Sequence, residues 1–427
     1  MKPLIVSYSD INGGAARAAY RLHKAFTLHH IHSKMMVSRK SSDDPDVISP
    51  QSKMTKAGAM LLLYLSRKIT KLQKTSNTVL HSLNIFPSGL YDRINDIGAD
   101  VVNLHWINHE AVSVEQVGRI KKPVVFTLHD MWAFCGAEHY YGDHTGARFV
   151  EGYETFNRPR GHGGIDLDRW IWSRKKKYWT KPRHVVCPSN WLADCARSSA
   201  LMRDWPIHVI PNAIDLGRFR PLDKSFCRGA LGLPLDSPII AFGAIGGTRD
   251  PRKGYDLLQS AIDILSPEVR LTEIKYIVFG QSQPKLPSNC SSNIQYMGYL
   301  HDDWSLALLY NSADAMVVPS RQEAFGQTAS EAQACGCPVV AFNATGLKDV
   351  VEDRKTGYLA EPFSPEDLAR GIKWVLQDPS RRKALSEAAR ERAERLWNSG
   401  KVADQYVNVY QEAIDRHNLH DCHKQRI

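Results

Sequence analysis

The chain has 427 residues, 43% of them hydrophobic and 23% charged, which is too long for one ordinary core and typical of two globular α/β domains. No apolar run of about 18 residues occurs, and no signal-peptide pattern precedes the first apolar run, so neither a membrane-spanning helix nor a secretory leader is expected. The net charge of +10 resides in residues 1–200, where 28 Lys and Arg stand against 17 Asp and Glu, and a basic half of this kind suits nucleic acid, anionic lipid or a phosphorylated substrate.

Short apolar runs alternate with helical patterns along the chain. Alternation of this kind predicts a parallel sheet covered by helices on both faces, and because it occurs twice we expect two Rossmann-like, doubly wound α/β domains. The predicted strands are Leu4–Ser7, Val101–Leu104, Val124–Leu128 and Val185–Cys187, followed by Ile239–Phe242, Tyr276–Phe279, Ala315–Val318 and Val339–Ala341.

The turn after the first predicted strand contains Gly13 and Gly14. The alanines that follow let a helix lie close to the sheet, and such a turn can place backbone N–H groups beside a phosphate. An ordinary tight turn is the alternative. The Gly-x-Gly-x-x-Gly and Gly-x-x-x-x-Gly-Lys-Ser/Thr patterns are absent from the sequence, which argues against dinucleotide and P-loop sites.

A basic segment surrounds the apolar stretch Met60–Leu65. A helix of this composition can lie on an anionic membrane surface and meet a lipid-linked acceptor, although an ordinary amphipathic surface helix is the alternative. The basic residues are Lys53, Lys56, Arg67, Lys68, Lys71 and Lys74.

Two neighbouring predicted strands end in a histidine followed by a second functional side chain. His105 and Trp106 end one strand, and His129 and Asp130 end the next. Active sites of open α/β folds collect at such strand ends. A single histidine is more often structural, but two at adjacent strand ends favour a functional role.

Domain boundaries follow from turn-forming residues. The first domain is expected over residues 1–210, a linker with two prolines over 211–221, and the second domain over 222–397. A C-terminal amphipathic helix, expected to pack back on the first domain, spans 398–416, and residues 417–427 are expected to form a polar, frayed tail.

No metal site and no disulfide are expected. The Asp-x-Asp patterns at Asp44–Asp46 and Asp166–Asp168 do not follow a strand end, and such short patterns arise by chance. None of the 8 Cys residues stands in a Cys-x-x-Cys pair, so buried free thiols in a reducing compartment are the better interpretation.

A basic loop follows the first predicted strand of the second domain. In the segment Asp250–Tyr255, Arg252 and Lys253 stand near the carboxyl end of that strand, where a diphosphate would be stabilised by cations. A solvated basic loop is the alternative.

The most informative stretch is Pro319–Ala332, which follows a strand and opens a helix. Gly326 permits close backbone approach, and the N–H groups of the first helical turn, at Gln327 and Thr328, form an anion site there.

Two carboxylates flank this anion site. Glu323 precedes the helix and Glu331 lies within it, so one can accept hydrogen bonds from sugar-ring hydroxyls and the other from ribose hydroxyls. The alternative is a capping box, Thr328-x-x-Glu331, in which Glu331 only caps the helix.

Together these motifs resemble the retaining glycosyltransferases of family four, which have the B-type fold of two Rossmann-like domains facing across a cleft. The His129–Trp132 stretch is similar to the branch that assembles bacterial exopolysaccharide, or the O-antigen of lipopolysaccharide. The resemblance covers most of the chain and is carried by Glu323-x7-Glu331 with Phe325-Gly326, Pro211–Asp215, Lys253-Gly254, Gly298–Leu300, Tyr310-x-x-Ala313-Asp314, Pro319-Ser320, Ala341 and Gly357-Tyr358.

The resemblance implies roles for the donor-side residues. Lys253 would neutralise the diphosphate of the donor, and Glu323 would hold the hydroxyls of its sugar. Glu331 would bind ribose. The backbone N–H groups near the donor would be those of Phe325, Gly326, Gln327 and Thr328, with Gly13 and Gly14 approaching the diphosphate from the first domain.

On the acceptor side, the resemblance places His129 as a catalytic residue that lines the sugar, with His105, Trp106 and Asp130 beside it. One departure concerns the second phosphate cation. The family has Arg where this chain has Ala244, so Arg249 or Arg252 would have to substitute.

The implied activity is a cytoplasmic, metal-independent hexosyl transfer from a nucleotide-diphosphate sugar to a hydroxyl of a growing glycan, in cell-surface polysaccharide assembly. No cofactor is implied. The expected partners are the nucleotide sugar, a glycan acceptor that can be lipid-linked, and the inner face of an anionic membrane. The alternatives are a sugar-nucleotide epimerase on the same fold and a basic nucleic-acid-binding protein. Dispersed Lys and Arg without a binding signature argue against nucleic acid.

Overall fold

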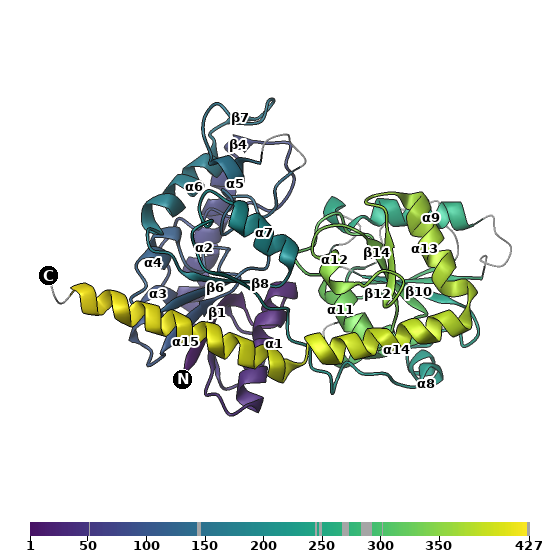
Figure 1. The fold of residues 1–427 in the computed structure, drawn as a ribbon. Helices are drawn as coiled ribbons and strands as arrows, with labels where there is room; N and C mark the ends of the chain where they lie inside the picture. Colours follow the sequence, from purple (N-terminus) through teal and green to yellow (C-terminus); the bar gives the residue numbers. More distant parts are fainter. Residues whose placement is uncertain are drawn as a thin grey trace. The chain divides into compact units, whose positions relative to one another are not determined.

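The computed structural model describes residues 1–50, 52–142, 147–243, 246, 250–266, 273–282, 293–300 and 302–424 (Figure 1). Its contacts divide the chain into two units. The first combines Met1–Pro211 with Val402–Ile427, and the second is Asn212–Lys401. Residues 212–221, expected as a linker, therefore belong to the second unit, where Ile214 and Phe219 are buried in its core.

The first unit contains a seven-stranded parallel sheet in the order β3-β2-β1-β5-β6-β8-β9. Its strands are β1 (Pro3–Ser9), β2 (Lys34–Arg39), β3 (Val47–Ile48), β5 (Val101–Leu104), β6 (Val124–Thr127), β8 (His184–Cys187) and β9 (Ile207–Val209). A small antiparallel pair lies outside this sheet, β4 (Gln73–Lys74) with β7 (Gly163–Gly164). The helices are α1 (Gly14–Leu28), α2 (Lys53–Thr70), α3 (Leu90–Asp96), α4 (Val114–Gly118), α5 (Arg148–Glu151), α6 (Leu167–Tyr178), α7 (Asn190–Ser198) and α15 (Ser399–Lys424).

The second unit contains a six-stranded parallel sheet in the order β12-β11-β10-β13-β14-β15. Its strands are β10 (Ile239–Gly243), β11 (Lys275–Phe279), β12 (Ile294–Gly298), β13 (Ala315–Val318), β14 (Val339–Phe342) and β15 (Gly357–Ala360). Its helices are α8 (Lys224–Ala230), the 3-10 turn η1 (Pro251–Lys253), α9 (Tyr255–Leu265), α10 (Asp303–Ser312), α11 (Gln327–Ala334), α12 (Leu347–Val350), α13 (Pro365–Gln377) and α14 (Pro379–Leu396).

Both sheets confirm the predicted fold class. All eight predicted strands are present, each within two residues of the expected ends, and every pairing in the two large sheets is parallel. The eight predicted strands are buried on both faces, and in the second unit two separate clusters of buried apolar side chains cover the two faces of its sheet. This burial explains their near-continuous apolar sequences.

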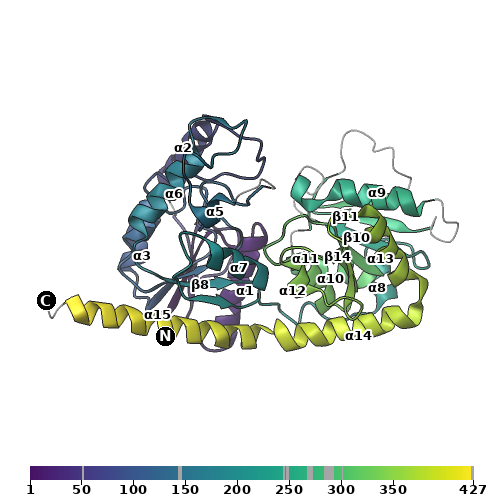
Figure 2. The same ribbon diagram turned by 45° about the horizontal axis from the view of Figure 1, so that its top comes forward.

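Helix α15 packs on the sheet of the first unit. Asn103 Nδ2 donates a hydrogen bond to the hydroxyl of Tyr410 at 2.7 Å, and the ring of Tyr410 lies 5.7 Å from that of Phe26 in α1. Both views show α15 running beside α1 (Figure 1 and Figure 2). The expectation of a frayed tail from residue 417 is wrong as far as Lys424, because the helix continues to that residue and contains no Gly or Pro after Gly400.

None of the helices in the described part of the chain is both long enough and apolar enough to cross a membrane.

Candidate functional site

The loop between β13 and α11 contains the predicted anion site. Gly326 adopts the left-handed conformation (φ 99°) at the start of α11, and a Cβ there would lie 2.7 Å from Cδ2 of Leu347. A side chain at this position would therefore meet both backbone strain and a clash. Among the described residues, no side chain caps the start of α11, so Gly326 sets the helix boundary through its backbone alone.

The capping-box alternative for Glu331 is wrong. The helix begins at Gln327, so Thr328 is already inside it and Glu331 lies beyond the third position that a capping box requires. Glu331 is instead buried and accepts a hydrogen bond from the hydroxyl of Tyr310 in α10, at 2.8 Å. The buried ring of Tyr310 packs edge-on against Phe279, so the carboxylate of Glu331 is oriented from the core of the second unit.

Lys253 and Glu323 form an ion pair, with Nζ 2.6 Å from Oε1. Ser320 Oγ donates a second hydrogen bond to the same carboxylate oxygen at 2.9 Å, and the backbone N–H of Glu323 donates to Thr345 Oγ1. The two side chains are 21% and 16% exposed, so the pair is reachable by a ligand but not fully solvated. The structure thus brings together two residues that are 70 positions apart.

Close backbone packing places Lys253 beside the loop after β13. Gly254 has a positive φ of 65°, and a Cβ there would clash with the carbonyl oxygen of Pro319, so only glycine fits. The backbone N–H of Arg321 also donates to the carbonyl of Arg252 at 2.7 Å. The turn that carries Lys253 is therefore fixed against the loop that carries Glu323.

Arg252 and Arg249 were predicted to substitute for the arginine that the family has at position 244, and the structure describes the first of them. Arg252 forms a two-point pair with Asp250, through Nη2 at 2.6 Å and Nε at 3.2 Å, so part of its charge is already neutralised. Arg249 and the position of the departure, Ala244, lie outside the described residues.

In the first unit, the predicted residues follow three adjacent strands. Gly13 and Gly14 begin α1 after β1, His105 follows β5, and His129 follows β6. Because β1, β5 and β6 are neighbours and parallel, these positions all lie where the carboxyl ends of the strands meet. The turn before Gly13 is shaped by the buried carboxylate of Asp10, which accepts hydrogen bonds from the backbone N–H groups of Ile11, Ser41 and Ser42.

His105 and His129 are in direct contact. Nδ1 of His105 lies 2.9 Å from Nε2 of His129, and the two rings stack at 5.2 Å. Burial lowers the pKa of His129 to about 4 and the pKa of His105 well below its ordinary value. Both rings are therefore neutral near pH 7, and the pair can share a hydrogen bond with a ligand but supplies no positive charge to a phosphate.

Asp130 links Trp106 to a histidine that was not predicted. Its Oδ2 accepts from Nε1 of Trp106 at 2.8 Å and lies 2.6 Å from Nδ1 of His139. Burial by itself would raise the pKa of Asp130, but the charge and hydrogen bond of His139, with further hydrogen bonds from Trp132 and Trp106, lower it overall. Asp130 is therefore ionised and orients Trp106 and His139.

Sequence reasoning missed Asp10 and His139 as site residues, and it named Tyr310 only as part of a family motif, without its contact with Glu331. Asp10 directly follows β1 and stands three residues after the predicted strand Leu4–Ser7, and that position was an available signal. His139 stands in a long loop and Tyr310 on a helix, and their roles depend on contacts with Asp130 and Glu331 that local sequence does not encode.

Family models match both parts of the chain. Residues 12–218 match the model described as Glycosyltransferase Family 4, and residues 226–392 match the model described as Glycosyl transferases group 1. The D-inositol 3-phosphate glycosyltransferases of Saccharomonospora viridis and Segniliparus rotundus are each 34% identical to this chain over 49% of its length. The matches cover 50% and 47% of those proteins, so the chain spans about half the length of the curated relatives it matches.

Solved structures share the whole fold. The sucrose-phosphate synthase of Thermosynechococcus elongatus is 20% identical with a TM-score of 0.68, covering 97% of this chain and 100% of that one. Anabaena HepE, solved in complex with UDP-glucose, is 16% identical with a TM-score of 0.64, covering 96% and 100%. WaaG, a glycosyltransferase involved in lipopolysaccharide biosynthesis, is 18% identical with a TM-score of 0.59, covering 94% and 98%. At these identities the likeness establishes the fold, which is GT-B.

Proposed function

The chain belongs to the family 4 glycosyltransferases, and from this premise we propose that it transfers a hexose from a nucleotide-diphosphate sugar to a hydroxyl of a growing glycan. The observation that carries the proposal is the Lys253–Glu323 ion pair beside Gly326 at the start of α11. A cation, a helix start and a sugar-binding carboxylate then stand together, which is the set of groups that a sugar diphosphate requires.

The bond that breaks joins the anomeric carbon of the sugar to the diphosphate oxygen, and the electron pair leaves with the diphosphate. Lys253 and the positive end of α11 stabilise the developing negative charge, which is the work that a metal ion does in other transferases. Glu323 accepts hydrogen bonds from the sugar hydroxyls and orients the ring, while Glu331 binds ribose. The acceptor hydroxyl attacks from the face of the leaving group and gives its proton to the departing diphosphate oxygen, so the anomeric configuration is retained.

The first unit carries the acceptor side in this proposal. The neutral pair of His105 and His129 offers hydrogen bonds to hydroxyls without attracting a second anion, and Trp106, held by Asp130, offers an aromatic surface of the kind that packs against sugar rings. A role in cell-surface polysaccharide is supported by the fold shared with WaaG. The names of the curated relatives make inositol 3-phosphate an acceptor worth testing beside the glycan.

Transfer is expected to proceed in excess EDTA and to give a product with the anomeric configuration of the donor. The experiment supplies UDP-, GDP- and ADP-hexoses with a lipid-linked glycan, with inositol 3-phosphate, or with no acceptor, and product anomers are identified by NMR. An epimerised sugar nucleotide formed without acceptor would support the epimerase instead. Activity lost in EDTA and restored by a divalent ion, or an inverted anomer, would contradict the mechanism.

We further infer that α2 attaches the protein peripherally to an anionic membrane. Ser66 is the buried residue of this helix, and Met60, Leu61 and Tyr64 are 73%, 57% and 55% exposed. Exposed apolar side chains flanked by lysines are the composition of an interfacial helix. The basic residues along the segment are exposed as well: Lys53, Lys56, Arg67, Lys68, Lys71 and Lys74.

The protein is expected to float with vesicles that contain phosphatidylglycerol and not with pure phosphatidylcholine. Replacing both Lys53 and Lys56 by Gln should weaken binding about 30-fold, because each lysine near an anionic surface contributes about 1 kcal/mol. Replacing Met60 and Leu61 by Ser should weaken binding to the same vesicles. Phe226→Ser, an equally exposed apolar position in the second unit, serves as the control. Equal flotation with neutral and anionic lipid would refute the attachment.

A further inference from the structure

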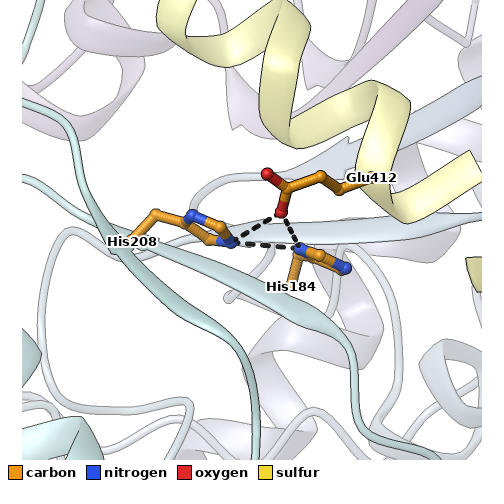
Figure 3. Close-up of side chains that lie close together, drawn as sticks. All are labelled: His184, His208 and Glu412. Carbon is orange, nitrogen blue, oxygen red and sulfur yellow. Dashed lines mark hydrogen bonds and ion pairs between the residues drawn. The ribbon is translucent and has the colours of Figure 1, made fainter.

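Three side chains from separate segments of the first unit converge at one edge of its sheet (Figure 3). Nδ1 of His184 lies 3.0 Å from Nε2 of His208. Oε2 of Glu412 lies 3.6 Å from the first nitrogen and 3.7 Å from the second. A metal ion needs several His, Cys, Asp or Glu ligand atoms close together. Among the described residues, one group of three such side chains has all its ligand atoms within 4.8 Å of one another, and it is this one.

The register of β8 and β9 and the packing of α15 bring these three side chains together. In the register of β8 and β9, His208 pairs with Val186. His184 is two residues before Val186, so the two histidines project from the same face of the sheet. Glu412 lies on α15. The hydrogen bond between Asn103 and Tyr410, which is half a helical turn before Glu412, anchors α15 on this sheet.

The separations fit a single metal ion. Three atoms at 3.0, 3.6 and 3.7 Å define a circle whose radius is about 2.0 Å, and zinc bonds to imidazole nitrogen and carboxylate oxygen at about 2.0–2.2 Å. Glu412 is too far from both rings for an ordinary hydrogen bond and contacts them at ion-pair distance, whereas the two rings share a hydrogen bond that a bound ion would replace. It is also 56% exposed, which leaves room for water as a fourth ligand.

We propose that His184, His208 and Glu412 bind one divalent transition-metal ion, preferentially zinc, which ties α15 to strands β8 and β9 of the first unit. Two imidazoles and one carboxylate are a ligand set that zinc accepts. His184 is the first residue of β8, whereas His105 and His129 follow the last residues of β5 and β6. Because these strands are parallel, the metal site lies toward the amino ends of the strands and the acceptor-side residues lie at their carboxyl ends. The ion has a structural role and takes no part in transfer.

One neighbouring charge opposes the ion. Arg416 stands one turn after Glu412 on α15 and acts electrostatically on His184. Arg416→Gln should therefore tighten metal binding, whereas the ligand variants weaken it.

The test uses the full-length protein stripped with a chelator and dialysed free of it. Calorimetric titration with Zn²⁺, and with Co²⁺ as a spectroscopic substitute, should show one ion per chain, and bound Co²⁺ should give the visible absorption of a four-coordinate site. Glu412→Gln and His208→Ala should each lower affinity by about 100-fold or more, since even loss of a group behind a metal ligand costs about 10–100-fold. Asp404→Asn, a matched charge change at an exposed position of α15, and His32→Ala, an exposed histidine, should leave the affinity unchanged.

The rate of amide hydrogen exchange distinguishes zinc bound at this site from zinc bound unspecifically elsewhere. Zinc should slow amide exchange in α15 around residues 406–416 and raise the melting temperature of the wild type, but should do neither in Glu412→Gln. Glu412 is exposed, so this variant keeps the fold even where His184→Ala does not. Zinc binding of equal affinity in Glu412→Gln and in the wild type, or absence of binding to the wild type, would overturn the proposal.

Discussion

Lys253→Met is expected to reduce kcat/KM for the donor by about 100- to 1,000-fold, because removing one preorganised donor to a developing oxyanion costs that much in other enzymes. Lys253 is the described cation that pairs directly with the proposed sugar-binding carboxylate, and the diphosphate leaves with additional negative charge. Methionine keeps the length of the side chain and its apolar stem while removing the charge. The loss should therefore appear in the chemical step and in donor affinity together.

The folded state should tolerate this change. The ion pair with Glu323 is partly exposed, and pairs of this kind contribute about 0–1 kcal/mol to stability. Glu323 also keeps its hydrogen bond from Ser320 when the lysine is removed. The melting temperature of Lys253→Met should thus stay close to that of the wild type, and the variant separates function from folding.

Two controls sharpen the comparison. Lys348→Met removes an exposed lysine from α12 of the same unit and should leave kcat/KM unchanged. Lys253→Arg keeps the charge but changes its geometry, so activity should be partly retained. If Lys253→Met lowers the melting temperature and leaves kcat/KM intact, the residue belongs to a solvated loop with a structural role only.

Central strands could be predicted from sequence, whereas edge strands could not. The eight predicted strands are buried runs of apolar residues, but β3, β9, β12 and β15 lie at the edges of the two sheets, and β2 lies next to an edge. The residues of β9 and β12 are only half-buried, so their sequences lack the continuous apolar pattern that identified the others.

The candidate site shows the same limit. Glu323 and Lys253 could be found because each follows a parallel strand, where the topology of the fold gathers ligand-binding residues. The partner of Glu331 could not be found, because Tyr310 is 21 residues away on another helix. The convergence of His184, His208 and Glu412 depends on strand register and on the packing of α15, neither of which leaves a local motif.

Glu331→Gln is expected to weaken nucleotide binding by about 10- to 100-fold, the equivalent of losing a charged hydrogen bond worth about 1.5–3 kcal/mol. Glutamine has nearly the same shape and still offers a carbonyl oxygen to the hydroxyl of Tyr310. Ribose hydroxyls, by contrast, lose a charged acceptor. Calorimetric titration with the nucleoside diphosphate of the preferred donor measures the effect.

The contact between Tyr310 and Glu331 means that Glu331→Ala tests two things at once. It removes the ribose acceptor and also the carboxylate that accepts a hydrogen bond from a buried tyrosine hydroxyl, which costs about 1–3 kcal/mol of stability, so its melting temperature should fall together with its affinity. Tyr310→Phe separates the two effects, because it removes the hydroxyl and keeps the carboxylate. If Glu331 binds ribose, Tyr310→Phe should lower the melting temperature with little change in nucleotide affinity, and Glu331→Gln should do the reverse. Matching losses of stability in all three variants, with nucleotide affinity preserved, would make Glu331 a core residue whose partner is Tyr310 and not the donor.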